Sequence, residues 1–179
     1  MNEVVVRRTL CLALAGLMAT SCVAVGGVAN ALLALNVLQF GAAFRPHGAP
    51  VAPTEQDAAA KAFSVSAGKA NIYLYRNETF RGNSGFEVSL DGRPLGTIFP
   101  MTFFRIEVEP GRHSLLSKDP GSRSYDSMLD VVADAGKNYF VWQEMKMEFP
   151  SGKTQLLQHI DETKGRAEVA ECQLLIASP

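Results

Sequence analysis

Cysteine is scarce in this chain, and the motifs of common enzyme classes are missing. The three cysteines, Cys11, Cys22 and Cys172, form no Cys-x-x-Cys pair, which argues against a zinc ribbon or a thioredoxin-type redox site. No Gly-x-Ser-x-Gly elbow is present, and the glycine-rich stretch 82–85 lacks the lysine of a phosphate-binding loop. The sequence therefore predicts a protein that is not an enzyme and that uses no metal and no cofactor.

Charged side chains are balanced over the chain but unevenly placed. The 179 residues carry 17 Lys+Arg and 18 Asp+Glu without a basic cluster, so the positive stripe that nucleic-acid binding needs is missing. The 36 residues from Thr9 to Phe44 include no charged side chain, whereas the 135 residues that follow them, Arg45 to Pro179, hold 15 Lys+Arg and 17 Asp+Glu. The pattern predicts an apolar leader joined to one soluble domain.

The leader has the layout of a secretory signal. Arg7 and Arg8 precede an apolar run over 10–18, and small residues over 19–21 stand directly before Cys22. This arrangement resembles the bacterial lipobox, in which a thiol after small residues receives diacylglycerol, although an alanine stands where a leucine is usual. Lipid attachment at Cys22 is therefore predicted. The alternative is that this thiol is a small apolar residue inside an uncleaved membrane helix.

The apolar character continues past the signal, beyond the length of one membrane span. A bilayer core about 30 Å thick needs roughly 20 helical residues, so the uncharged stretch is too long for one span and short for two. Either 1–21 is a cleaved signal and 22–44 an apolar membrane tether, or an uncleaved signal-anchor helix runs from about Thr9 into the Val28 region. A third arrangement is simple cleavage after 29–31, which has the Ala-x-Ala form.

The leader also predicts where the soluble part lies. With Arg7 and Arg8 as the flanking positive charges, the positive-inside rule places the N-terminus in the cytoplasm and the domain in the periplasm. Val23 after Cys22 is not the aspartate that tends to retain lipoproteins at the inner membrane. We therefore expect the outer membrane if the chain is lipidated, and the inner membrane otherwise.

The soluble part is divided by its composition into a linker and a domain. Residues 45–68 hold a Pro-rich spacer over 46–53 and a short Ala-rich helix that Thr54 is expected to cap. Residues 69–179 form the predicted β-domain, in which apolar residues alternate with a period of two and turn signals separate the runs. The predicted strands cover 71–75, 86–90, 93–99, 104–108, 113–116, 127–133, 137–147 and 154–160.

These patterns predict a mainly β fold. The strands point to an antiparallel β-sandwich of the immunoglobulin or PEGA type, followed by one short C-terminal helix over Asp161–Glu171. An apolar N-terminal helix and the Pro-rich spacer would precede it.

Four motifs occur in the order of one bacterial pattern. They are Asn71-Ile72-Tyr73-Leu74-Tyr75-Arg76, Leu90-Asp91-Gly92 with Leu95-Gly96, Pro110-Gly111-Arg112-His113, and Gly136-Lys137-Asn138-Tyr139-Phe140. With them the chain resembles, over roughly Lys69 to Leu174, the family called domain of unknown function 2846, found in many proteobacterial predicted lipoproteins. The resemblance implies an envelope location and an unassigned activity, and it brings no catalytic residues.

Aromatic residues in two strands are the candidates for a ligand site. Tyr73, Tyr75 and Trp142 would form a platform for a sugar or a peptide if they were exposed. The alternative is that these rings belong to the core or lie under the C-terminal helix.

Histidines offer a weaker alternative, a cryptic hydrolase in which His113 or His159 stands beside a carboxylate such as Glu144. The structural interpretation of His113 is a ring paired with a backbone carbonyl or a carboxylate. Taken together, the sequence predicts a membrane-tethered envelope protein that presents a small β-sandwich to the periplasm, in a non-catalytic binding or structural role. Membrane lipid would be contacted through the N-terminus, and a protein or envelope-polymer partner is not identified.

Overall fold

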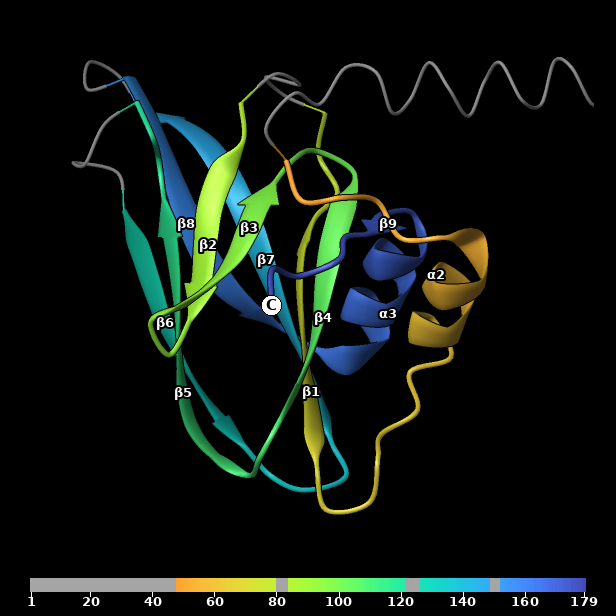
Figure 1. Ribbon diagram of the computed structural model, residues 1–179. Coiled ribbons are helices and arrows are strands. Elements are labelled where there is room, and N and C mark those ends of the chain that lie inside the picture. The colour runs from red at the N-terminus through yellow and green to blue at the C-terminus, as the bar shows by residue number, and fades with distance from the viewer. Residues whose placement is uncertain (1–47, 80–83, 122–125, 149–151) are drawn as a thin grey trace, which may run out of the picture. The chain divides into compact units, whose positions relative to one another are not determined.

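The computed structural model describes residues 48–79, 84–121, 126–148 and 152–179 (Figure 1). The predicted signal 1–21, the tether 22–44 and the lipid-attachment residue Cys22 lie outside the described residues, as do residues 45–47 of the linker. Among the helices that are described, none has the length and apolarity to cross a membrane.

Two β-sheets face each other and enclose the main core (Figure 1). The five-stranded sheet has the order β8 (Gly152–Ile160), β7 (Asn138–Glu148), β1 (Ala70–Arg76), β4 (Thr102–Val108) and β9 (Gln173–Leu174). The four-stranded sheet has the order β3 (Arg93–Ile98), β2 (Phe86–Leu90), β5 (Gly111–Lys118) and β6 (Ser127–Ala133). The mainly β fold with two facing sheets is thereby confirmed.

The core is built from the side chains that point inward from the strands of both sheets. Ile72, Leu74 and Phe104 from the five-stranded sheet meet Leu115 and Val131 from the four-stranded sheet, and all five are fully buried. Successive side chains of a strand point to opposite faces, so the same alternation leaves a second set of residues on the outer face of each sheet.

The five-stranded sheet is mixed, so the prediction of a wholly antiparallel sandwich is wrong. β1 pairs with β4 in the antiparallel sense but with β7 in the parallel sense, from Asn71↔Asn138 to Tyr75↔Trp142. The short β9 is also parallel to β4. After β6 the chain crosses from the four-stranded sheet to the five-stranded sheet at the end where β1 begins. β7 therefore starts beside the start of β1 and runs in the same direction. The assignment to the immunoglobulin or PEGA type stays a prediction.

Two helices cover the outer face of the five-stranded sheet (Figure 1). α3 (Glu162–Ala170) confirms the predicted C-terminal helix, and the Lys164 amide donates to the Asp161 carboxylate that caps it, at 3.0 Å. α2 (Thr54–Ala60) confirms the short helix of the linker, but its predicted cap is wrong. Pro53 occupies the N-cap position without a side-chain bond, because Thr54 already belongs to the helix.

The C-terminal segment closes the side of the sandwich between β4 and β3. The Leu175 amide donates to the Phe103 carbonyl of β4 at 2.8 Å, and the Ser178 amide donates to the Leu95 carbonyl of β3 at 2.8 Å. Residues 50–52 pair with the same segment from outside, through the Val51↔Leu175 bridge. The described end of the predicted spacer therefore belongs to the compact unit, which spans His47–Pro179.

The opposite side, between β6 and β8, is joined by side chains. The Leu157 amide of β8 donates to the Ser127 hydroxyl of β6 at 3.0 Å. Nearby, a buried polar group links three strands: the Gln143 amide nitrogen donates to the Ser117 hydroxyl at 2.7 Å and to the Gln155 side-chain oxygen at 2.6 Å. The Gln143 side-chain oxygen is buried and has no hydrogen-bond partner among the described residues.

Candidate binding site

Tyr73 and Tyr75 are fully buried, which excludes them from an exposed platform and corrects that prediction. The Tyr73 ring stacks on Phe140 with ring centroids 5.0 Å apart, and its hydroxyl donates to the Ala60 carbonyl of α2 at 2.9 Å. The Tyr75 hydroxyl donates to the Glu168 carboxylate of α3. Burial and this hydrogen bond raise the pKa of Tyr75. Strand alternation turns the two tyrosine rings away from the main core, to the outer face of the sheet. There α2 and α3 cover the rings and remove them from water.

Trp142 lies at the margin of the same aromatic cluster. Its side chain is half-buried, and the Lys164 ammonium lies 5.6 Å from the centroid of its ring, a cation–π arrangement. With two buried tyrosines and a tryptophan covered by a lysine, the three residues form a helix-covered cluster, as the structural interpretation expected.

His113 is held by two acceptors, which confirms the structural interpretation of this residue. Its Nδ1 lies 2.7 Å from the Asp91 carboxylate and its Nε2 lies 2.8 Å from the Glu109 carbonyl oxygen. Because both partners only accept, the arrangement favours the protonated imidazole, in which both ring nitrogens donate. Partial burial lowers the pKa of His113, but the hydrogen bonds to Asp91 and Glu109 and the charge of Asp91 outweigh it, so the pKa is raised.

Of the candidate residues of a hydrolase, His113 lies beside the Asp91 carboxylate and not beside Glu144, and His159 and Glu144 do not meet. His159 is exposed and bonds the Asp130 carbonyl at 3.0 Å, whereas Glu144 pairs with Lys146 at 2.9 Å. Since β7 and β8 pair Val141 with His159 and Glu144 with Leu156, the histidine and the carboxylate project from opposite faces of the sheet. Within the described ranges, no group of three or more His, Cys, Asp or Glu could hold a metal ion.

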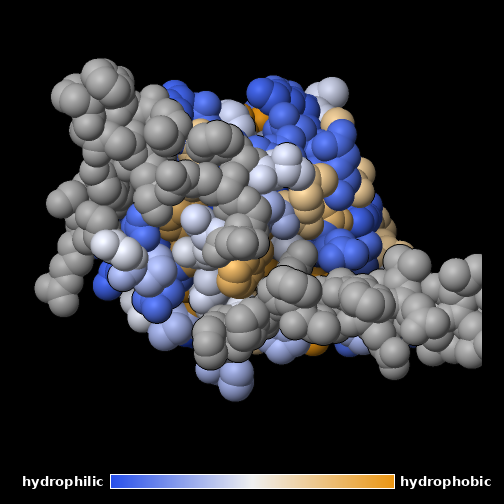
Figure 2. All heavy atoms as spheres, turned by 90° about the horizontal axis from the view of Figure 1, so that it is seen from above, coloured by the Kyte–Doolittle hydropathy of each residue, from blue (hydrophilic) through white to orange (hydrophobic). Residues whose placement is uncertain are grey.

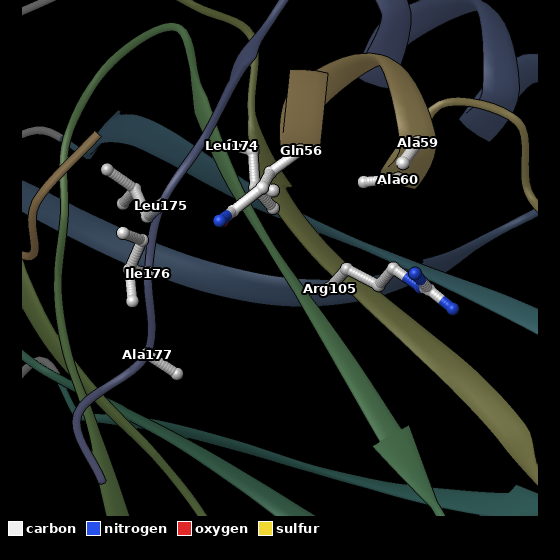
Figure 3. Close-up of a pocket in the computed structure, with 8 residues that line it drawn as sticks. All are labelled: Gln56, Ala59, Ala60, Arg105, Leu174, Leu175, Ile176 and Ala177. Atoms are coloured by element: carbon white, nitrogen blue, oxygen red, sulfur yellow. The ribbon is translucent and has the colours of Figure 1, made fainter. Parts of the chain in front are cut away.

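A pocket of about 350 Å³ lies between α2, β4 and the C-terminal segment (Figure 3). This volume is within the range of small-ligand sites in proteins. α2 contributes Gln56, Ala59 and Ala60, and the C-terminal segment contributes 174–177. The Arg105 side chain extends from β4 into the space beside α2 (Figure 3). Most of the lining is apolar, with one amide and one guanidinium as its polar groups.

Arg105 carries a charge that nearby residues do not neutralise. One terminal nitrogen donates to the Ser64 carbonyl across 3.3 Å, and the Nε–H is buried without an acceptor. Among the residues that the structure describes, no carboxylate lies within 4 Å of this guanidinium. Asp57 of α2 is engaged with Lys61 at 2.7 Å and with the Leu174 amide at 2.8 Å, and Glu107, two positions further along β4, accepts from the Ser66 hydroxyl. The pocket therefore combines apolar walls with an unmatched positive charge.

Sequence reasoning missed this site. The alternation of β4 places Arg105 on an outer face, but nothing local indicates what covers that face. The walls come from segments far apart in the chain, as the bond between Asp57 and Leu174, 117 positions apart, shows. The linker helix was predicted without any chemical role.

A second pocket, of about 500 Å³, is lined by Glu87, Lys118, Asp119, Pro120 and Asp126. Its lining is polar and its charges are of both signs. The Asp119 carboxylate already accepts the Gly121 amide at 2.8 Å. This pocket is a weaker candidate, because its lining is mainly polar, whereas small-molecule sites are mostly apolar with a few polar groups.

Exposed apolar residues are scattered over the described surface. The largest exposed fractions belong to Met128 with 70% and Val132 with 60%, both on the outer face of β6. Figure 2, seen from above, shows hydrophilic residues interleaved with hydrophobic ones on the described surface that faces the viewer. Single exposed apolar residues are ordinary in soluble domains and identify no interface by themselves.

Two comparisons place the chain among known proteins. The family model described as a protein of unknown function (DUF2846) matches residues 66–155. An uncharacterized protein of Haemophilus influenzae strain Rd is 26% identical over 129 residues, which are 72% of this chain and 74% of that protein. The family match includes Arg105 but not α2, α3 or the C-terminal segment, so the walls of the pocket lie outside it.

Proposed function

The chain belongs to the DUF2846 family of proteins of unknown function, and on that premise we propose a membrane-tethered binding protein of the bacterial cell envelope. Its N-terminal residues hold it at a membrane, and its β-sandwich extends into the periplasm. The domain acts by binding rather than by catalysis, with the pocket beside α2 as its binding site. The membrane is the outer one if Cys22 carries lipid, and the inner one otherwise.

One observation carries the tethering. The 36 residues from Thr9 to Phe44 contain no charged side chain, and Arg7 and Arg8 precede them. An uncharged run of this length is far longer than the apolar segments of a soluble domain of this size, and its flanking arginines favour export of the domain on its C-terminal side. The binding role is supported by the unmatched Arg105 charge in an apolar pocket.

Metabolic labelling with a lipid analogue tests the lipidated form. We expect the wild type and the matched control Cys11→Ala to be labelled and to sediment with membranes, whereas Cys22→Ala is not labelled. Equally low labelling of wild type and Cys22→Ala would contradict lipidation. Mass spectrometry of the N-terminus then identifies an uncleaved anchor helix, which leaves Met1 or Asn2 intact.

Cell fractionation tests the tether itself. Full-length protein is expected in the membrane fraction after a high-salt wash, since apolar burial in a bilayer is insensitive to ionic strength. Recovery of the full-length chain in the cytosolic fraction would refute the proposal in all its forms.

A further inference from the structure

The free edge of β4 lies next to Arg105. The pairing of β4 with the C-terminal segment ends at Phe103↔Leu174, after which the chain leaves β4 and reaches Leu95 of β3. β4 itself continues to Val108. Among the described residues, no strand pairs with the outer edge of β4 from Arg105 onward. Unpaired backbone at a sheet edge is a site at which an extended peptide can add as a further strand.

The charge in the pocket matches a carboxylate. Arg105 brings one positive charge to the pocket lining, and the terminal nitrogens of a guanidinium can bind a carboxylate through two parallel hydrogen bonds. The other walls are the apolar side chains of the C-terminal segment and the alanines of α2, which suit an apolar side chain better than a strongly hydrated group. A volume of about 350 Å³ accommodates the last residue or two of a peptide.

We propose that this pocket binds the free C-terminal carboxylate of an extended peptide segment, which continues along the open edge of β4. Arg105 binds the carboxylate, the apolar walls contact the terminal side chain, and the β4 backbone pairs with the residues before it. The inference rests on the proposed function, because it names the ligand class of that same site.

Fluorescence anisotropy with purified full-length protein in detergent tests the proposal. The probe is a dye-labelled pool of tetrapeptides with randomised last two positions, used once with a free C-terminal carboxylate and once as the C-terminal amide. We expect the carboxylate pool to bind at least about tenfold more tightly than the amide pool, because the amide cannot form the charged pair. Added salt weakens this difference.

Three variants separate Arg105 from other causes. Arg105→Gln lowers the affinity for the carboxylate pool about tenfold, and Arg105→Lys gives an intermediate loss because a lysine cannot bind both oxygens. The matched control Arg112→Gln, on the exposed face of β5, leaves binding unchanged. Ala59→Trp fills the pocket from the exposed side of α2 and abolishes binding while Arg105 stays in place. Unchanged thermal unfolding of the variants excludes a folding defect.

Three outcomes would overturn the assignment. They are equal binding of the amide pool, undiminished binding by Arg105→Gln, and no binding of either pool at millimolar concentration. If dodecanoate binds in an Arg105-dependent way and the peptide pool does not, the ligand is an alkyl carboxylate and the peptide proposal is wrong. None of these results affects the labelling and fractionation tests, so the tethering proposal stands or falls separately.

Discussion

Replacing Gly165 by alanine tests how closely α3 lies against β7. A Cβ at this position would stand 2.3 Å from Cγ, 2.5 Å from Cβ and 2.6 Å from Cδ1 of Phe140. These atoms are the base of a buried ring that is itself stacked on Tyr73, so they cannot swing aside as the end of a flexible side chain could. Either α3 or the strand must move.

Two opposing effects set the magnitude. Alanine is favoured over glycine in a helix interior by about 1 kcal/mol. Overpacking of a tight core costs about 1–3 kcal/mol, and three contacts below 3.0 Å place Gly165→Ala near the upper end. We therefore expect a net loss of about 1–2 kcal/mol in the free energy of unfolding, opposite in sign to the effect of helix propensity alone.

Urea unfolding of the full-length protein measures this loss. Trp142 is the chain's one tryptophan and lies beside Lys164 of α3, so its fluorescence reports on this contact. Ala167→Gly, at an exposed position of the same helix, is the matched control and should cost about 1 kcal/mol through propensity alone. In the Phe140→Ala background, Gly165→Ala should cost at least about 1 kcal/mol less, because two of the three crowded atoms, Cγ and Cδ1, are then absent. If Gly165→Ala stabilises the wild-type protein by about 1 kcal/mol, the close approach of α3 is wrong.

Three further predictions concern single groups. The pair of His113 and Asp91 should stabilise the fold most between about pH 3.8 and 6.5, the ordinary pKa values of the two groups, because the pKa of Asp91 is lowered and that of His113 is raised. The contribution of this pair is lost as the pH rises through the raised pKa of His113 or falls through the lowered pKa of Asp91. In Asp91→Asn, the melting temperature measured against pH should therefore change less across this range than in the wild type. Gln143→Ala should cost about 2–4 kcal/mol in urea unfolding, and Gln143→Met at least about 1 kcal/mol less, since it fills the same space and removes the unpaired oxygen; equal losses would contradict this. Burial raises the pKa of Cys172 to about 12, so peptide mapping after iodoacetamide treatment at pH 8 should find this thiol alkylated only in unfolded protein, and rapid native alkylation would show that the site is open.

The strands could be predicted because their signals are local. The predicted strand over 127–133 coincides with β6, and Asp91 and Gly92, with φ of 52° and 79°, adopt the left-handed conformations that a two-residue hairpin turn needs. The parallel pairing of β1 with β7 could not be predicted in this way. β1 and the part of β7 that pairs with it are largely apolar on both faces, so the pattern does not show which neighbour each one takes, or in which direction.

The candidate functional residues also differ in whether their environment could be predicted from nearby sequence. His113 was correctly predicted to pair with a carbonyl or a carboxylate. The Glu109 carbonyl is only four positions away, whereas the Asp91 carboxylate, 22 positions away, is brought to it by the pairing of β2 with β5. The aromatic platform of Tyr73 and Tyr75 was wrong, and the alternative, in which these rings are buried or lie under the C-terminal helix, is what the structure shows. Arg105 was missed, since an arginine on an outer strand face is ordinary until the surrounding walls are known.

The sequence by itself determined the uncharged leader, the positions of the strands and turns, and the C-terminal helix, because charge, alternation and capping act over a few residues. Tertiary structure decided which outer face is covered and where a pocket remains. A strand's alternation defines two faces but not what packs on them. That depends on contacts such as the one between Asp57 and Leu174, 117 positions apart, which form only when the whole domain has folded.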